Sequence, residues 1–200
     1  MFTRLSITWI LACAALAASA DTVSLTLKSN GAIVPGESQF ASLGRANTID
    51  CFSFDLKAAL ATSAASGTAT GRRNYAPIKF VKRIDKASVM IWKALTQNEM
   101  IDATFNFYRP NPNGGEQLYY TVRLTQARVT GFHQFTPQAS DPKNIGFAVW
   151  EEVEITFGAI VCEYVGGIQH QDSLRSGGPP LGRVPPPGVT VHPHPKPDRS

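Results

Sequence analysis

The stretch that decides the fold is residues 78–97, IKFVKRIDKASVMIWKALTQ. Its first part alternates apolar Ile78 and Phe80 with polar Lys79, which is typical of a strand with one buried face. The period then changes: Asp85 is a favourable N-cap residue, and the apolar residues after it recur every three or four positions. The stretch therefore predicts a strand followed by one amphipathic helix over about 86–97.

The predicted helix has a single apolar stripe that should cover an open side of a sheet. Trp92 lies off this stripe, so we expect it to be exposed or to lie at a contact with another subunit. The stripe consists of Ala87, Met90, Ile91, Ala94 and Leu95.

Outside the helix, apolar and polar residues alternate with a period of two, which predicts strands. Residues 101–109 and 117–130 flank the turn-rich sequence PNPNGG and are expected to form a hairpin. A last strand is expected over 149–165, with a bulge at Gly158. Many strands and one helix predict a mainly β protein, a closed or nearly closed β-barrel of antiparallel strands with one flanking α-helix.

Two further segments carry specific expectations. Residues 49–56 predict a strand that places Phe52, Phe54 and Leu56 on one face. Residues 58–71 are small and weakly polar, so they have little apolar bulk to bury, and they predict a mobile loop.

The two ends of the chain differ from its centre. Residues 1–20 combine a basic start, an apolar run and a small-residue cleavage motif, which is typical of a secretory signal peptide. The alternatives are a membrane anchor, for which the run is short, and lipoprotein processing at Cys13. Residues 169–200 are rich in proline and glycine and predict a disordered tail that stays free or docks on a partner. The globular domain is therefore expected over 21–168, in a secreted or periplasmic protein without stable membrane insertion.

The charge of the chain gives no reason to expect nucleic acid as a partner. The net charge is +4 and the pI is about 9.1, but residues 21–168 hold 14 basic and 13 acidic side chains. The excess of positive charge therefore lies at the ends of the chain.

Without residues 1–20, two cysteines remain, Cys51 and Cys162. The sequence leaves open whether they form one disulfide or stay as two separate buried thiols.

The order of these elements resembles the Hcp family, the hemolysin-coregulated proteins of type VI secretion, over most of residues 22–165. Five pieces carry the resemblance: a glycine-glutamate-serine turn, the strand after it, the opening of the helix, the second hairpin strand and the closing strand. Each piece is weak alone, and the match rests on their order and spacing around one helix. They read IVPGES (33–38), IDCFSF (49–54), IDKAS (84–88), GEQLYY (115–120) and EEVEITF (151–157).

The resemblance implies a subunit that assembles with itself. In this family a barrel with a flanking helix forms a hexameric ring, rings stack into the inner tube of a contractile injection machine, and small effectors travel in the lumen. The resemblance also implies that Gly36, Glu37 and Ser38, with the loop after them, contact neighbouring subunits or rings. Typical members have no Sec signal, so residues 1–20 also allow a secreted relative that forms rings on its own.

No constellation of catalytic or metal-binding residues emerges from the sequence. His133 is the only histidine before the proline-rich tail, and no nucleophile motif surrounds it. Glu151 could pair with a second carboxylate for acid–base work, but Glu152 and Glu154 share one strand face, which fits a solvated or lumen-facing surface. The tail histidines have no cysteine or carboxylate partners at ligand spacing. We therefore expect no enzyme activity, no cofactor and no metal.

Two functional hypotheses lead, ahead of a third and weaker one, an envelope hydrolase whose activity would be lost on changing His133. The first is a structural ring subunit whose partners are copies of itself and small effector proteins. The alternative is an exported monomeric β-barrel that binds a small apolar ligand or a peptide, with Phe105, Phe107, Tyr119 and Tyr120 lining a pocket. A packed core explains these aromatic residues at least as well. A ligand-sized cavity inside one barrel is the feature that discriminates between the two.

Overall fold

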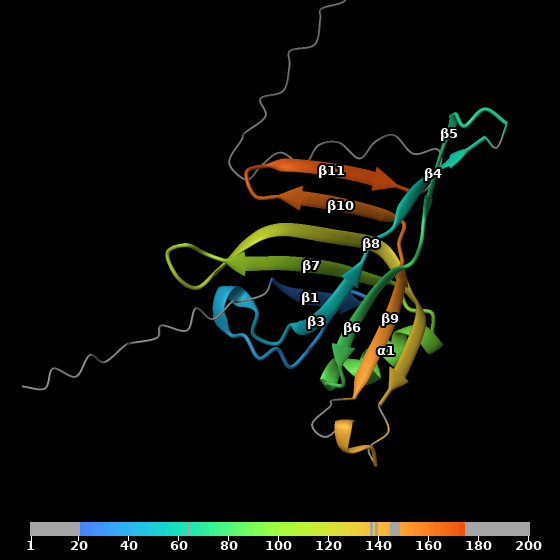
Figure 1. The fold of residues 1–200 in the computed structure, drawn as a ribbon. Helices are drawn as coiled ribbons and strands as arrows, with labels where there is room; N and C mark the ends of the chain where they lie inside the picture. The colour runs from blue at the N-terminus through green and yellow to red at the C-terminus, as the bar shows by residue number, and fades with distance from the viewer. Residues whose placement is uncertain (1–20, 64, 137, 139, 145–148, 175–200) are drawn as a thin grey trace, which may run out of the picture.

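The chain folds around one long strand, β8, that pairs with three others (Figure 1). The computed structural model describes residues 21–63, 65–136, 138, 140–144 and 149–174. The elements are β1 (Thr22–Ser29), β2 (Ala32–Val34), η1 (Ser42–Gly44), β3 (Ile49–Asp55), β4 (Ala58–Thr62), β5 (Ala69–Tyr75), β6 (Ile78–Arg83), α1 (Lys86–Thr96), β7 (Ile101–Pro110), β8 (Glu116–Phe135), η2 (Pro142–Asn144), β9 (Trp150–Thr156), β10 (Ala159–Tyr164) and β11 (Ile168–Ser173).

Six strands close into a barrel. Their order is β8, β7, β1, β3, β6 and β9, and β9 pairs again with β8. Each of these pairings is antiparallel. Closure removes the exposed edges that an open sheet of this size would present. The predicted fold class, a mainly β protein with an antiparallel barrel and one flanking helix, is confirmed.

Strand β8 forks the sheet because its two halves have different neighbours. Residues 120–125 pair with β10, whereas residues 128–135 pair with β9. Between them Gln126 has a φ of +52°, and a Cβ added to Gly158 would lie 3.0 Å from the Gln126 side chain. The bulge predicted at Gly158 is therefore a complete break between two strands. β9 closes the barrel, and β10 and β11 extend the sheet beyond it.

The barrel interior is filled with apolar side chains from all six strands. Leu25, Phe80, Phe105, Val153 and Ile155 are each 0% exposed. They alternate along their strands with residues that face outward, as the period of two predicts. Complete burial of a side chain of this size contributes about 1.5–3 kcal/mol, so this core is the main source of stability.

The predicted helix is α1, and it begins where the sequence places it. Asp85 accepts a hydrogen bond from the Ala87 amide at 3.0 Å, and the Ser88 hydroxyl accepts one from the Asp85 amide at 3.0 Å. This reciprocal capping box satisfies amides that have no partner in the first turn. Ala87, Ile91 and Ala94 are buried, so the predicted stripe packs on the barrel.

The predicted face of β3 is wrong for Phe52. This side chain is 52% exposed, whereas Phe54 packs against the core. The register between β3 and β6 shifts between Cys51 and Ser53. Such an irregularity turns one residue to the other side of the strand, and the period of two cannot reveal it.

Two segments expected to be irregular contain strands. Residues 58–71 were predicted as a loop, but β4 pairs with β5 in a separate hairpin. Backbone pairing needs no large side chains, so small residues do not exclude it.

Residues 169–173 were assigned to the tail, yet they belong to β11, which pairs along its whole length with β10. These residues contain no proline, and the prolines begin only at Pro179. The rest of the predicted tail and the predicted signal peptide lie outside the described residues.

Arg45 holds the loop before β3 against the end of the β7–β8 hairpin. Its side chain is 1% exposed, and its guanidinium carbon lies 4.4 Å from the ring centres of both Phe40 and Tyr108. It also forms an ion pair with Glu116. The hydrogen bond from Arg45 holds the pKa of Glu116 below its ordinary value. Two stacking contacts and one charged pair therefore fix this loop.

We expect Arg45→Lys to lower the free energy of unfolding by about 2–3 kcal/mol, because lysine has no planar group to stack between two rings and no guanidinium to make the hydrogen bond that lowers the pKa of Glu116. Urea unfolding followed by circular dichroism measures the loss. Arg123→Lys is the matched control, since Arg123 is 49% exposed on β8 and forms an ion pair with Glu163, with an expected change below about 0.5 kcal/mol. The pKa of Glu116 is lowered in the folded state, so the Arg45–Glu116 pair stabilises the fold fully at any pH above the pKa that Glu116 has in the unfolded chain. The Arg45→Lys deficit should therefore shrink as the pH falls through the folded pKa. A pH-independent loss, or a loss no larger than the control, would contradict this role.

Candidate functional site

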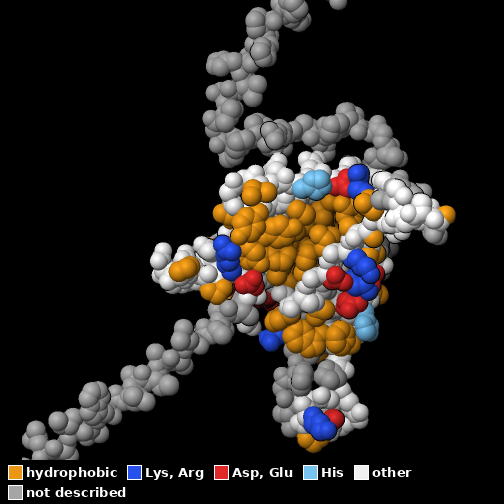
Figure 2. Space-filling model, turned by 45° about the horizontal axis from the view of Figure 1, so that its top comes forward, with side chains coloured by type: hydrophobic (Ala, Val, Ile, Leu, Met, Phe, Trp, Pro, Cys, Tyr) orange, Lys and Arg blue, Asp and Glu red, His pale blue; other side chains and the backbone are white. Residues whose placement is uncertain are grey.

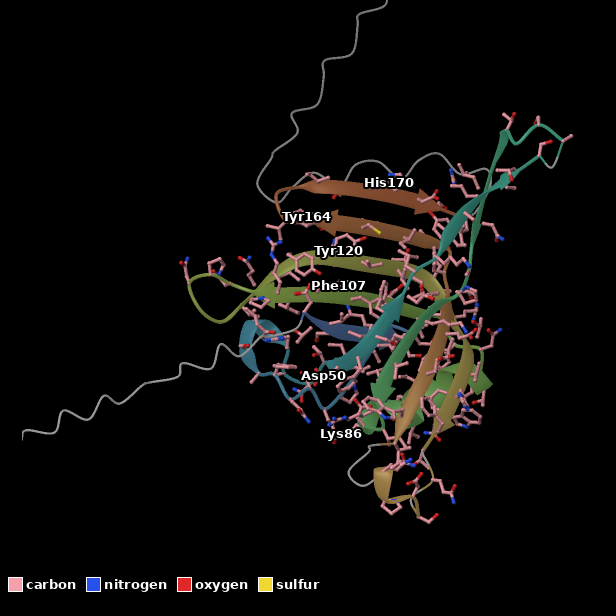
Figure 3. The ribbon with its side chains drawn as sticks, in the orientation of Figure 1. Asp50, Lys86, Phe107, Tyr120, Tyr164 and His170 are labelled. Atoms are coloured by element: carbon pink, nitrogen blue, oxygen red, sulfur yellow. The ribbon has the colours of Figure 1, made fainter. Side chains whose placement is uncertain are left out.

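The inner face of the barrel continues onto the two strands that leave it. Directly paired residues point to the same side of a sheet, and the register links Phe107 to Tyr120, Tyr120 to Tyr164, and Tyr164 to Ile168. Tyr164 and Ile168 are 40% and 74% exposed. Figure 2 shows a broad hydrophobic surface on this side of the molecule, and Figure 3 shows Phe107, Tyr120, Tyr164 and His170 on β7, β8, β10 and β11. We call this surface the open face and define it by Phe54, Phe107, Tyr120, Cys162, Tyr164 and Ile168.

A series of aromatic ring contacts connects the buried core to the open face. The Phe54 ring centre lies 4.8 Å from that of buried Phe105 and 5.1 Å from that of Phe107, which in turn lies 5.3 Å from that of Tyr120. Burial raises the pKa of Tyr120 above its ordinary value, and a hydrogen bond with Cys162 adds to the shift. The phenol therefore stays neutral at physiological pH. An uncharged, aromatic sheet surface is suited to contact with protein rather than with ions.

A buried carboxylate ties the extension to the base of the β4–β5 hairpin. The Tyr75 hydroxyl donates to Asp172 of β11 at 2.8 Å, and Arg73 forms an ion pair with Asp172 at 2.7 Å. Burial and this hydrogen bond raise the pKa of Tyr75 to about 12. The position of β10 and β11 is therefore fixed on the side away from β8.

The predicted contact segment, Gly36, Glu37 and Ser38, is tightly held within its own chain. The Gly36 amide donates to the Asn47 carbonyl at 2.8 Å, and a Cβ at Gly36 would lie 2.3 Å from the Thr48 carbonyl oxygen. Only glycine fits there. Gly36 is buried and Ser38 is half-buried, whereas Glu37 is exposed and forms a 3.5 Å ion pair with Lys86. Of the three, Glu37 is the side chain most available to another molecule.

A buried ion pair that the sequence analysis missed lies between the barrel and the helix. The Lys82 ammonium is 2.6 Å from the Glu151 carboxylate, and both side chains are 0% exposed. Ser88 donates to the same Glu151 oxygen at 2.9 Å, and Gln134 donates to the other oxygen at 2.6 Å. Lys82 also pairs with the N-cap residue, Asp85, at 2.8 Å. The network therefore joins β6, β8, β9 and the N-terminus of α1.

The individual residues gave a weak signal of this network. By the period of two, Lys82 falls on the same strand face as Ile78 and Phe80, and Glu151 falls on the same face as Val153 and Ile155. Each is therefore a single charged residue on an apolar face. The register pairs Lys82 directly with Glu151, which the sequence alone does not supply. Glu152 and Glu154 are partly exposed and both contact Lys79, at 3.6 and 2.5 Å, so their predicted common face is confirmed.

The other candidate residues are dispersed. Cys51 and Cys162 are both free thiols in the structure, so the disulfide left open by the sequence is not formed. Cys51 lies in the core, where burial raises the pKa of its thiol above the ordinary value, whereas Cys162 lies on the open face beside Tyr120. The ring of His133 stacks on Phe135 with centres 5.2 Å apart. Within the described ranges, no cluster of three or more His, Cys, Asp or Glu side chains is arranged to hold a metal.

The β4–β5 hairpin projects from the body of the molecule (Figure 1). All five residues of β4 are exposed, including Leu60 at 53%. A two-stranded hairpin is at best marginally stable in water by itself. This hairpin therefore offers backbone and apolar side chains to a second molecule.

Comparison with known proteins is consistent with this arrangement. The sequence model of the family described as "Type VI secretion system effector, Hcp" matches residues 25–164. The chain belongs to the Hcp family. A curated relative, the "Major exported protein" of Pseudomonas aeruginosa, is 32% identical over 113 residues, which are 56% of this chain and 66% of the relative. The match thus spans just under two thirds of that relative. Hcp proteins are structural components of type VI secretion rather than a family of enzymes.

Solved structures of Hcp proteins share the fold. A crystal structure of an Hcp protein superposes with a TM-score of 0.71 at 18% identity, over 79% of this chain and all of that one. The Hcp1 protein from the E. coli EAEC 042 pathovar gives a TM-score of 0.66 at 26% identity, over 76% and 97%. Over the described residues, no helix of this Hcp chain has the length and apolar character needed to cross a bilayer.

We expect Lys82→Met to lower the free energy of unfolding by about 3–5 kcal/mol, because it leaves the Glu151 carboxylate buried without its cation. Chemical unfolding monitored by circular dichroism gives the value. Lys79→Met is the matched control, since Lys79 lies on the same strand and is 45% exposed. The double variant Lys82→Met/Glu151→Leu should recover most of the loss. A single-variant loss equal to that of the control would show that the pair has no such role.

Proposed function

We propose that this chain is a structural subunit that assembles with copies of itself, and that a neighbouring copy covers the open face. The main support is that the core side of the sheet continues past the barrel to the exposed residues Tyr164 and Ile168. Burying apolar surface contributes about 25 cal/mol per Å², and contiguous apolar patches mark interaction sites. An assembled state is therefore favoured over a free monomer.

The assembly that we propose is a closed ring. A contact between the open face and a different surface of the next copy repeats by rotation, and it closes when the rotation divides the circle. The likeness to the Hcp family implies six subunits around a central channel. The function then resides in this geometry, with no catalytic step and no cofactor.

Two exposed elements are proposed to contact the next ring in a stack. The β4–β5 hairpin projects from the body and exposes Leu60. The segment Gly36, Glu37 and Ser38 is held by backbone hydrogen bonds of its first and last residues, and it exposes the Glu37 carboxylate. A rigid support under an exposed group lowers the entropic cost of making a contact.

We further propose that the chain is exported, with residues 1–20 as a secretory leader and a secreted or periplasmic destination. The name of the Pseudomonas aeruginosa relative, "Major exported protein", supports export. Small effector proteins and other components of the secretion machine are the proposed further partners. The alternative, a monomeric barrel with an internal ligand, has less support, because Phe80 and Phe105 and their neighbours fill the barrel.

Size-exclusion chromatography with light scattering tests the ring directly. The purified chain should elute as one species with the mass of about six subunits, as closure by rotation requires. A monomer at tens of micromolar would reject the proposal.

A single charge should break the ring if the open face is the contact. We expect Ile168→Asp to reduce the mass to that of a monomer or to weaken assembly at least roughly tenfold, because a buried carboxylate without a partner is costly. Val89→Asp is the matched control, since Val89 is 73% exposed on α1 and Ile168 is 74% exposed on β11. Circular dichroism checks that both variants fold. An unchanged mass for Ile168→Asp would remove the open face from the interface.

The β4–β5 hairpin should be needed for the stacking of rings but not for the closure of one ring. We expect Leu60→Asp to keep the single-ring mass and to abolish longer stacks, because it places a charge at an exposed apolar residue of β4 in the proposed contact between rings. Negative-stain electron microscopy at high protein concentration counts stacked particles. Stacks of normal length in Leu60→Asp would assign the hairpin another role.

A further inference from the structure

A groove lies between helix α1 and the second half of β8, outside the barrel. Its volume is about 440 Å³. Trp92 and Phe132 form its aromatic wall, with ring centres 5.3 Å apart, and Ile84 and Val89 add exposed apolar surface. Trp92 is 51% exposed, as its position off the helix stripe predicts. Exposed tryptophan beside a second ring provides a large apolar contact at low entropic cost.

The groove continues into a smaller acidic notch of about 140 Å³. The two hollows share Ile84 and Asp85. Glu37, Asp50 and Asp85 line the notch together with one cation, Arg83. Asp85 is already paired with Lys82, and Glu37 is exposed at the rim, where it forms a 3.5 Å ion pair with Lys86. The surface is therefore aromatic at one end and has an excess of carboxylates at the other.

The chain itself contains a segment with the complementary chemistry. Residues 175–200 follow directly on β11 and contain eight prolines, four basic residues and one acidic residue. Within them, Arg183 and Val184 precede the run Pro185-Pro186-Pro187. Consecutive prolines favour the polyproline II conformation, which binds grooves lined by aromatic side chains because little entropy is lost.

The length of the segment is sufficient for this contact. The described residues end at Leu174, and the 13 residues from there to Pro187 extend to about 40 Å at about 3.1 Å per residue, which is roughly the diameter of a domain of this size. The segment can therefore reach the groove of its own chain or that of an adjacent copy.

We propose that residues 183–187 bind in this groove, with the three prolines against Trp92 and Phe132 and with Arg183 at the carboxylates of the notch. The contact buries the exposed indole and places a cation next to Glu37 and Asp50. It involves neither the open face nor the β4–β5 hairpin, so closure of a single ring does not depend on it, and Glu37 is the one residue that it shares with the proposed contact between rings.

Quenching of Trp92 fluorescence by acrylamide tests the contact in the full-length chain. Trp9→Phe and Trp150→Phe leave Trp92 as the only tryptophan. We expect the quenching constant to rise about twofold when Pro185, Pro186 and Pro187 are all replaced by serine, because the indole loses its cover. The matched control replaces three other prolines of the same tail by serine: Pro193, Pro195 and Pro197. This control should leave the quenching constant unchanged.

The charged half of the contact has its own pair of variants. Arg183→Glu should raise quenching, whereas Lys196→Glu, an equal charge reversal in the same tail, should not.

A free peptide of residues 175–200 should restore protection to the serine variant. Protection that survives dilution indicates binding within one chain, and protection that is lost with dilution indicates a neighbouring chain. Light scattering on the same samples should give an unchanged mass. Equal quenching of the parent chain and the Pro185–187 serine variant would overturn the proposal without affecting that of the ring.

Discussion

The structure depends on the fact that a strand can pair with only one neighbour on each side at any point along its length. Strand β8 gives one side to β7, and it gives the other first to β10 and then to β9. The second half closes the barrel. The first half pairs with β10 and not with β9, so it cannot close the barrel. The apolar side of the sheet that forms the core therefore continues onto β10 and β11. The open face is therefore a consequence of the same pairing that creates the barrel, and no separate patch of surface residues had to be added.

Charged side chains fix the geometry around this core. The buried Lys82–Glu151 pair joins β6 and β9 to the capping box of α1, and Arg45 locks the loop before β3 to the end of the hairpin. Buried ion pairs contribute little net stability compared with apolar residues of the same volume, but they penalise every arrangement that separates the partners. Their role here is to hold α1, and the loop that carries Glu37, in one position relative to the sheet. A rigid subunit of this kind can repeat the same contact in successive copies.

The parts of the fold that depend on neighbouring residues could be predicted from the sequence. Asp85 and the spacing of Ala87, Ile91 and Ala94 predicted α1, and alternation about the PNPNGG turn predicted the β7–β8 hairpin. Features set by distant strands could not be predicted. Phe52 is turned outward by a register shift, β11 forms because β10 is there to pair with it, and Lys82 meets Glu151 69 positions away. The open face was missed for the same reason. Tyr120, Tyr164 and Ile168 form one surface only through the register of three strands, and each looks unremarkable within its own segment.

The central claim is that a second copy covers the continuation of the core onto β10 and β11. Hydroxyl-radical footprinting of the unmodified protein, read by mass spectrometry at Tyr120, Tyr164 and Ile168, tests this directly. The account predicts that these three side chains are protected at concentrations where the assembly forms. Their reactivity should then rise with dilution in step with the loss of assembled mass, while Met100, which is 49% exposed and lies outside the open face and the groove, keeps a constant reactivity. Full reactivity of the three residues in an intact assembly would contradict the account, because the subunits would then meet through another surface.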